Sequence, residues 1–124
     1  MIVWLACSTP CPEGAADPAR EARIEALVGE LPPLCFGGRS VQSGEVLLLE
    51  DSEPDEALGA KARHLALHAE QGPDPSGPDC LEQWMAREEE AWALEADWRR
   101  RLGLDEGHGM PATLEAEYAE RCSQ

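Results

Sequence analysis

Two histidines lie four residues apart in the stretch "KARHLALHAEQ", which covers residues 61 to 71. The sequence predicts a helix here, and on a helix the positions i and i+4 project from the same face. The ring nitrogens of His64 and His68 can therefore approach one tetrahedral metal ion, which is the physical basis of an H-x-x-x-H metal site. Two ligands do not complete such a site, so a third ligand must come from elsewhere in the chain.

A glutamate on the next predicted helix is the candidate third ligand. This helix runs from about residue 80 to residue 102 and carries three consecutive glutamates, at positions 88 to 90. Its apolar residues form one stripe, and the gaps in that stripe fall at Glu88 and Glu95, whereas Glu89 and Glu90 lie further round the helix. A carboxylate on a buried stripe must be paired, protonated or bound to metal, which singles out Glu88. The alternative is that the glutamates form a solvated face and that the histidines serve packing.

The elements that must position these residues follow from helical spacing and turn residues. A first helix is predicted over residues 18–31, with Asp17 as its N-cap and Pro32 after its end. Residues 34–50 change character and predict two short strands, of which the run from residue 46 to residue 49 is the clearer one.

Three further helices are predicted after these strands. The helix with the two histidines takes Ser52 or Asp55 as its N-cap and ends at Gly72. The long helix with the glutamates follows a loop rich in proline and glycine, and a short helix over about residues 113–121 completes the chain. This order predicts an α+β domain in which helices predominate. We expect a single domain over residues 18–124, preceded by an N-terminal apolar segment and loop over residues 1–17.

The layout of a strand, an H-x-x-x-H helix, a loop and a second helix with a glutamate resembles the zincin metalloprotease fold. The resemblance covers about residues 18–103 and includes the pattern Glu88-x-x-Ala91-Trp92. This pattern is similar to the E-x-x-A-D or E-x-x-A-N sequence that carries the third ligand in glutamate-liganded zincins. Trp92 stands where the family has an acidic or amide residue that supports the site from outside the ligand shell.

This resemblance implies that His64, His68 and Glu88 bind zinc, and that the H-x-x-x-H helix packs on the long helix. It also implies that residues 45–50 form the edge strand of a cleft. One position departs from the family, because Leu65 stands where active zincins have the glutamate that activates a zinc-bound water. Leucine cannot accept a proton. The resemblance therefore implies a zincin-like domain without peptidase activity, and a zinc hydrolase with another general base is the alternative.

The composition excludes some classes of partner. The chain has 25 acidic and 10 basic residues and a formal net charge of −15. Such a surface repels nucleic-acid phosphates and anionic lipid headgroups. We therefore expect no nucleic-acid binding and no transmembrane helix, and a protein partner stays open.

Five cysteines are dispersed along the chain without a C-x-x-C pair, which favours disulfides over a structural zinc site and predicts an oxidising compartment. The N-terminus, "MIVWLACSTPCPEG", resembles the end of a bacterial lipoprotein signal peptide in which Cys7 carries the lipid, although its apolar run is short and no basic residue precedes it. A short buried strand over residues 2–6 is the alternative. We expect an extracytoplasmic protein, periplasmic or lipid-anchored, and the alternative is a cytosolic acidic interaction protein with reduced cysteines.

If Cys7 carries lipid, four cysteines remain for two disulfides, and three pairings are open. Cys80 begins the long helix and Cys122 lies near the end of the chain, so one hypothesis pairs these two and pairs Cys11 with Cys35. The ending Tyr-x-x-Arg-Cys is similar to that of uncharacterised predicted lipoproteins of GC-rich bacteria. The function we expect is a binding or structural role.

Overall fold

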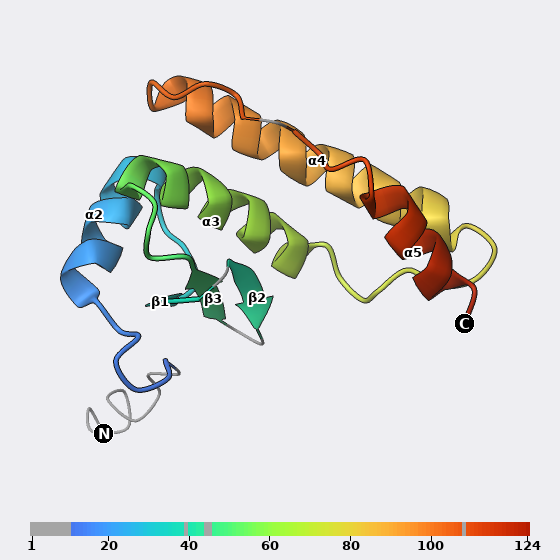
Figure 1. The fold of residues 1–124 in the computed structure, drawn as a ribbon, viewed down its shortest axis with the longest axis horizontal. Coiled ribbons are helices and arrows are strands. Elements are labelled where there is room, and N and C mark those ends of the chain that lie inside the picture. The colour runs from blue at the N-terminus through green and yellow to red at the C-terminus, as the bar shows by residue number, and fades with distance from the viewer. Residues whose placement is uncertain (1–10, 39, 44–45, 108) are drawn as a thin grey trace.

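The structure is a computed structural model that describes residues 11–38, 40–43, 46–107 and 109–124. Within these ranges, three short strands and four helices follow one another in the order α2, β1, β2, β3, α3, α4 and α5 (Figure 1). Helices predominate, as the sequence predicted for an α+β domain. Cys7 and the apolar N-terminal segment lie outside the described residues, so lipidation of Cys7 and the alternative strand there stay predictions, as does the domain division after residue 17.

Helix α2 spans Pro18–Val28 and begins as predicted, because the Asp17 side chain accepts a hydrogen bond of 3.1 Å from the backbone N–H of Arg20. The predicted end at residue 31 is wrong, since the helix stops at Gly29. Gly29 adopts a φ of +91°, which glycine tolerates without steric cost. Arg63 of helix α3 also donates a hydrogen bond of 2.8 Å to the carbonyl of Val28. This contact is between distant residues and could not be recognised from local sequence.

The sheet has three strands, β1 (Leu34–Phe36), β2 (Val41–Ser43) and β3 (Val46–Leu49), in the spatial order β1-β3-β2. Strand β3 pairs in parallel with β1 and antiparallel with β2. The two predicted strands are present as β2 and β3, but the sequence did not predict β1, which is too short to show an alternating pattern. The implied edge position of the strand within residues 45–50 is wrong, since β3 lies in the centre of the sheet and β2 forms an edge.

Helix α3 spans Asp55–Glu70 and its N-cap is Pro54, without a side-chain hydrogen bond at the cap. The predicted N-caps at Ser52 or Asp55 are therefore wrong. Two arginines of α2 hold the start of α3 instead, because Arg20 and Arg23 form ion pairs of 2.7 and 3.0 Å with the two carboxylate oxygens of Asp55.

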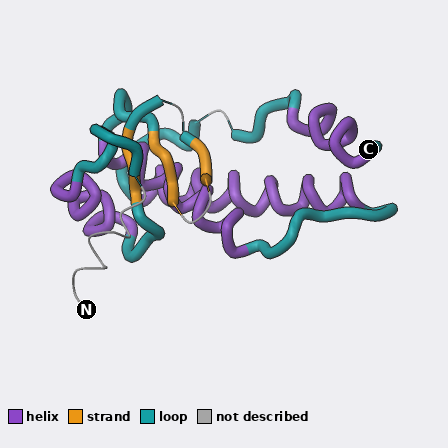
Figure 2. The backbone as a smooth tube through the Cα atoms, turned by 90° about the horizontal axis from the view of Figure 1, so that it is seen from below, coloured by secondary structure: helices purple, strands orange, loops and turns teal. Residues whose placement is uncertain are grey.

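Helix α4 spans Cys80–Arg101 and helix α5 spans Leu114–Cys122, close to their predicted bounds. In Figure 1, α4 runs alongside α3 in the opposite direction, and α5 lies beside the N-terminal part of α4. Figure 2 shows the strands gathered at one end of the molecule, and contacts between elements place α3 between the sheet and α4. None of the helices in the described part of the chain is long and apolar enough to cross a membrane.

The main hydrophobic core joins α2, the sheet and the inner face of α3. It consists of Ile24, Val28, Leu34, Phe36, Leu47, Leu49, Leu58, Ala62 and Ala66. Gly59 lets α2 and α3 approach closely, because a Cβ atom there would lie 2.9 Å from a methyl carbon of Val28. A second, smaller cluster joins α4 to α5 through Cys80, Trp84 and Tyr118. The candidate site lies where the α3–α4 contact meets this second cluster.

Candidate metal centre

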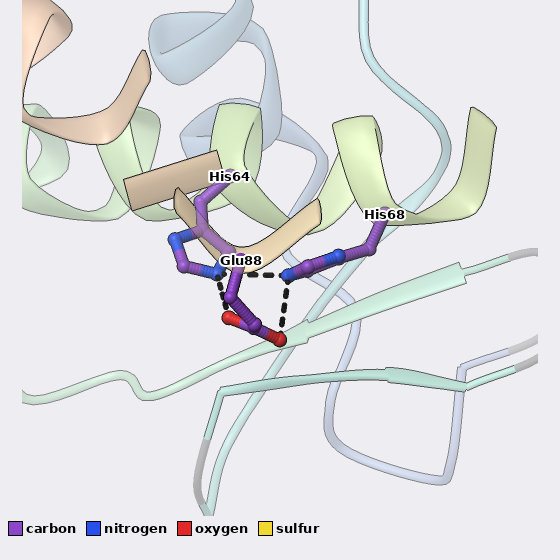
Figure 3. A group of neighbouring side chains, drawn as sticks. All are labelled: His64, His68 and Glu88. Carbon is purple, nitrogen blue, oxygen red and sulfur yellow. Dashed lines mark hydrogen bonds and ion pairs between the residues drawn. The ribbon is translucent and has the colours of Figure 1, made fainter. Parts of the chain in front are cut away.

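His64, His68 and Glu88 lie together between α3 and α4, as the sequence predicted (Figure 3). The Nε2 atoms of the two histidines are 3.2 Å apart. One carboxylate oxygen of Glu88 lies 3.2 Å from Nε2 of His68, and the other lies 3.9 Å from Nε2 of His64. In each residue one nitrogen or oxygen atom lies within 4.8 Å of its counterparts in the other two, so the group could hold a metal ion.

The spacing of these atoms is that of ligands around a small tetrahedral ion. With metal–ligand bonds of about 2.0–2.1 Å, neighbouring ligand atoms of a tetrahedral site lie about 3.3 Å apart. The two distances of 3.2 Å agree with this value, and the distance of 3.9 Å needs only a small adjustment of the Glu88 carboxylate. Two histidines and one glutamate would leave the fourth position of a tetrahedral ion open.

Gln71 fixes the orientation of the His68 ring. The Oε1 atom of Gln71 lies 2.9 Å from Nδ1 of His68. The amide nitrogen of Gln71 donates to the carbonyl of Arg87 and to the carboxylate of Glu90, both at 3.3 Å, so the amide oxygen must face the ring. His68 therefore carries a proton on Nδ1, and its Nε2 atom points at the candidate metal position.

Glu95 holds the other histidine in a similar way. The Nδ1 atom of His64 lies 2.8 Å from Oε1 of Glu95, which is the distance of an ion pair, although the two atoms do not form a regular hydrogen bond. Lys61 forms an ion pair of 3.1 Å with the same carboxylate oxygen. A carboxylate on the outer nitrogen of a histidine is the usual support of a metal-bound imidazole. The stripe on α4 predicted that Glu95 is buried, but its role beside His64 required the packing of α3 on α4.

These outer contacts leave three electron-pair donors facing one another. When Nδ1 of a neutral imidazole carries the proton, Nε2 presents a lone pair. With the proton on Nδ1 of both histidines, two such nitrogens and a carboxylate converge between largely buried side chains, since His64 and Glu88 are only 5% and 6% exposed. Mutual repulsion of these donors is relieved by a proton or by a metal ion between them.

Without a metal, the charges at the group favour a proton on His68. Burial acts to lower the pKa of His68, but hydrogen bonds with Glu88 and Gln71 outweigh it and raise the pKa above its ordinary value. Burial also acts to raise the pKa of Glu88, but the hydrogen bonds from His68 and Tyr118 lower it to about 2. The metal-free group therefore contains an ionised carboxylate and a site at which a proton and a metal ion compete.

Two donors that the sequence did not assign to the site hold the Glu88 carboxylate. The hydroxyl of Tyr118 donates a hydrogen bond of 2.7 Å to one carboxylate oxygen, and the indole N–H of Trp92 donates one of 3.0 Å to the other. The Trp92 ring also contacts the His64 ring edge-on, at 4.7 Å between ring centres. Trp92 thus supports the group with an indole N–H, and no spacing in the sequence indicated Tyr118.

The glutamates of α4 are buried or exposed as the apolar stripe of this helix predicted. Glu88 and Glu95 are each 6% exposed, whereas Glu89 and Glu90 lie on the exposed side of α4. Leu65, the residue after His64, is half-buried and packs against the main hydrophobic core. A carboxylate at position 65 is absent, so this position supplies no base for hydrolysis.

Both disulfides of the hypothesis from the sequence are present. Cys11 is bonded to Cys35, with their Cα atoms 5.4 Å apart, and Cys80 is bonded to Cys122, with a separation of 5.7 Å. The first bond attaches the segment before α2 to strand β1. The second attaches the end of α5 to the start of α4, and α5 carries Tyr118, so this disulfide holds the partner of Glu88 in place.

The three predicted ligands come from two helices that the sequence could identify separately. The packing of α3 on α4 joins them and adds Gln71, Glu95, Trp92 and Tyr118 as supporting residues. Comparisons of the chain with family models, with curated proteins and with solved structures found no match. The evidence for a metal site is therefore the geometry of His64, His68 and Glu88.

Proposed function

We propose that this protein is a zinc-binding protein of zincin-like fold that has a binding or structural role and no peptidase activity. The observation that carries the proposal is the convergence of the Nε2 atoms of His64 and His68 on the Glu88 carboxylate, while other residues hold both Nδ1 atoms. Neutral imidazole and carboxylate are ligands that zinc accepts, and the distances suit its tetrahedral preference.

The zincin-like assignment is supported by the order of the elements. A small sheet precedes the H-x-x-x-H helix, which packs on a long helix that presents a glutamate to the two histidines. Leu65 supports the loss of peptidase activity, because no proton acceptor stands at the position of the general base. Zinc, when bound, would crosslink α3 to α4 and would offer an open coordination position.

The proposed location is outside the cytoplasm, in the periplasm or at a membrane through lipid on Cys7. Support comes from the disulfides Cys11–Cys35 and Cys80–Cys122, because such bonds persist in oxidising compartments. Thiol counting on denatured protein from its native host tests this part. The proposal expects four cysteines in disulfides, and five free thiols would contradict it.

Metal analysis tests the zinc site, with a matched pair of variants on one helix. The purified chain should bind one zinc, and Glu88→Gln should lower the affinity for zinc in competition with a chromophoric chelator. Glu89→Gln, which changes the adjacent exposed carboxylate, should bind zinc like the wild type. A normally folded chain without zinc affinity, or equal affinity in all three proteins, would show that the group is not a zinc site.

A peptide library tests the absence of peptidase activity in the zinc-loaded chain. We expect no cleavage by the wild type and a gain of cleavage on Leu65→Glu, which restores the carboxylate of a zincin. Leu65→Gln is the control, because the glutamine side chain has the size of glutamate but cannot act as a base. Cleavage by the zinc-loaded wild type would overturn the non-proteolytic role in favour of a hydrolase with another base.

A further inference from the structure

A pocket of about 270 Å³ opens beside the candidate metal group. His68 and Glu88 form part of its wall, and helix α5 closes another part with Tyr118 and Arg121. This volume is sufficient for a ligand of the size of a blocked amino acid. The pocket therefore lies where a ligand could reach the open side of the group.

Two arginines line this pocket, and their guanidinium groups contact backbone carbonyls and aromatic rings. Arg87 donates hydrogen bonds to the backbone carbonyls of Gly72 and Pro73, at 3.4 and 2.9 Å. The guanidinium of Arg121 lies over the rings of Trp84 and Tyr118, at 5.3 and 5.2 Å from their centres. Neither arginine forms an ion pair with a carboxylate in the described part of the chain.

Most of the other cationic side chains in the described residues do pair with carboxylates, in a chain of 25 acidic and 10 basic residues. Six of them form ion pairs: Arg20, Arg23, Lys61, Arg99, Arg100 and Arg101. Arg63 is the exception, and it donates to the backbone carbonyls of Val28 and Glu30. The pocket wall carries two guanidiniums and two carboxylates, those of Glu88 and of the exposed Asp74. With zinc on the proposed metal group, which neutralises Glu88, the pocket is a positive region on an acidic protein and attracts anions.

The remaining walls of the pocket are apolar. Leu65 lines it from α3, and the stacked rings of Trp84 and Tyr118 line it from α4 and α5, with ring centres 4.5 Å apart. A glutamate at position 65, as in a zincin, would place a negative charge in this wall. Leucine removes that charge and adds apolar surface. Leucine at position 65 therefore removes the general base of a zincin and also makes the pocket wall compatible with an anion that has an apolar body.

We infer that this pocket binds a small organic acid, in which a free carboxylate faces Arg87 and Arg121 and an apolar body packs on Leu65 and Trp84. The free C-terminal residue of a peptide has this chemistry. Arginine recognises a carboxylate through paired, charge-assisted hydrogen bonds. The inference rests on the proposed function for the metal group beside the pocket, while the two arginines carry the recognition of the acid.

Calorimetry with N-acetyl-leucine and N-acetyl-leucinamide as probes tests this inference on the full, disulfide-bonded and zinc-loaded chain. The second probe has a neutral amide of similar size in place of the carboxylate of the first. We expect the amide to bind at least about tenfold more weakly, because hydrogen bonds to charged groups contribute this much or more. Arg87→Gln and Arg121→Gln should each weaken binding of the acid about tenfold. Arg100→Gln, an exposed arginine outside the pocket, should not weaken it.

Leu65→Glu and Leu65→Gln test the wall of the pocket. The charged variant should bind N-acetyl-leucine several-fold more weakly than the neutral variant, because like charges repel at short range. Equal binding of acid and amide, or full binding by both arginine variants, would overturn the inference. Inorganic phosphate that binds more tightly than N-acetyl-leucine would also overturn it, because the apolar walls would then contribute nothing.

Zinc affinity, measured in the same samples, separates this inference from the proposed function. A chain that binds one zinc but does not distinguish acid from amide contradicts the inference and leaves the zinc site intact. A chain that binds no zinc contradicts the proposed function. If that chain still binds N-acetyl-leucine in a way that depends on Arg87 and Arg121, the anion pocket is supported without the metal.

Discussion

Tyr118 donates a hydrogen bond of 2.7 Å from its hydroxyl to the carboxylate of Glu88, and this contact joins the last helix to the candidate metal group. The Tyr118 ring stacks on Trp84, and α5 is covalently attached to α4 two turns before Glu88. The burial of Tyr118 and the nearby Glu88 charge both raise the pKa of the hydroxyl, so it stays protonated and remains a donor. Helix α5 therefore contributes a supporting residue to the candidate metal group.

Tyr118→Phe should lower the affinity for zinc about tenfold, because loss of a supporting hydrogen bond to a metal ligand typically has an effect of this size. The substitution keeps the aromatic ring that stacks on Trp84, so the helical content should not change. Competition with a chromophoric chelator measures the affinity, and circular dichroism checks the fold. Zinc affinity equal to that of the wild type would show that the hydroxyl does not support Glu88.

Glu95→Gln should weaken zinc binding about 10-fold to 100-fold, because the carboxylate beside the outer nitrogen of His64 would lose its charge. The variant keeps the size of the side chain. The same chelator competition measures the effect, with Glu89→Gln, an exposed change on the same helix, as the control. If both variants bind zinc equally well, Glu95 has only a structural role.

Removal of the disulfide between Cys80 and Cys122 should affect both stability and zinc. The bond closes a loop with a sequence separation of 42, so its loss through Cys80→Ser and Cys122→Ser should destabilise the fold by about 4 kcal/mol. Zinc affinity should fall as well, because α5 would no longer hold Tyr118 against Glu88.

The disulfide between Cys11 and Cys35 is the matched control for this experiment. Its loss should lower the free energy of unfolding by a similar amount, about 3.5 kcal/mol, since the sequence separation is 24. Zinc affinity should stay near that of the wild type, because this bond attaches the segment before α2 to the sheet. Equal loss of zinc affinity in the two double variants would contradict a specific role of α5.

The ion pairs between α2 and α3 predict a dependence of stability on pH. Hydrogen bonds from Arg20 and Arg23 lower the pKa of Asp55, against the opposing effect of partial burial. A carboxyl with a lowered pKa in the folded state stabilises the fold at a pH above its ordinary value of 3.8. This stabilisation should disappear as the pH falls through the lower pKa of the folded state.

Urea unfolding of the wild type and of Asp55→Asn, from pH 6 to about pH 2, measures this effect. The wild type should be the more stable protein at pH 6, and the difference should shrink as Asp55 becomes protonated. A difference that stays constant over the whole range would show that the charge of Asp55 does not stabilise the start of α3.

The ligands of the candidate site could be predicted because the information is local to each helix. His64 and His68 share a helical face by their spacing, and the apolar stripe of α4 placed Glu88 and Glu95 on its buried side. Both predictions needed only the period of a helix. The resemblance to zincins implied that the helix with the two histidines packs on the long helix. In the structure α3 does pack on α4.

Some features of the fold and of the site could not be predicted, because they depend on contacts between residues that are distant in the sequence. Strand β1 has three residues and is recognisable only through its pairing with β3, which also places β3 in the centre of the sheet. The start of α3 is held by Arg20 across the fold and not by a capping side chain. Gln71 and Tyr118 reach the metal group from a helix end and from another helix, so no spacing in the sequence indicates them.

X-ray absorption of the zinc-loaded, disulfide-bonded protein tests whether His64, His68 and Glu88 bind zinc. We expect one zinc per chain, surrounded by nitrogen and oxygen at about 2.0–2.1 Å, with the scattering pattern of two imidazoles and no sulfur ligand. Glu88→Gln should disturb this spectrum, and Glu89→Gln should leave it unchanged. A spectrum with zinc–sulfur distances of about 2.3 Å, or a chain that binds no zinc, would show that these three residues are not a zinc site.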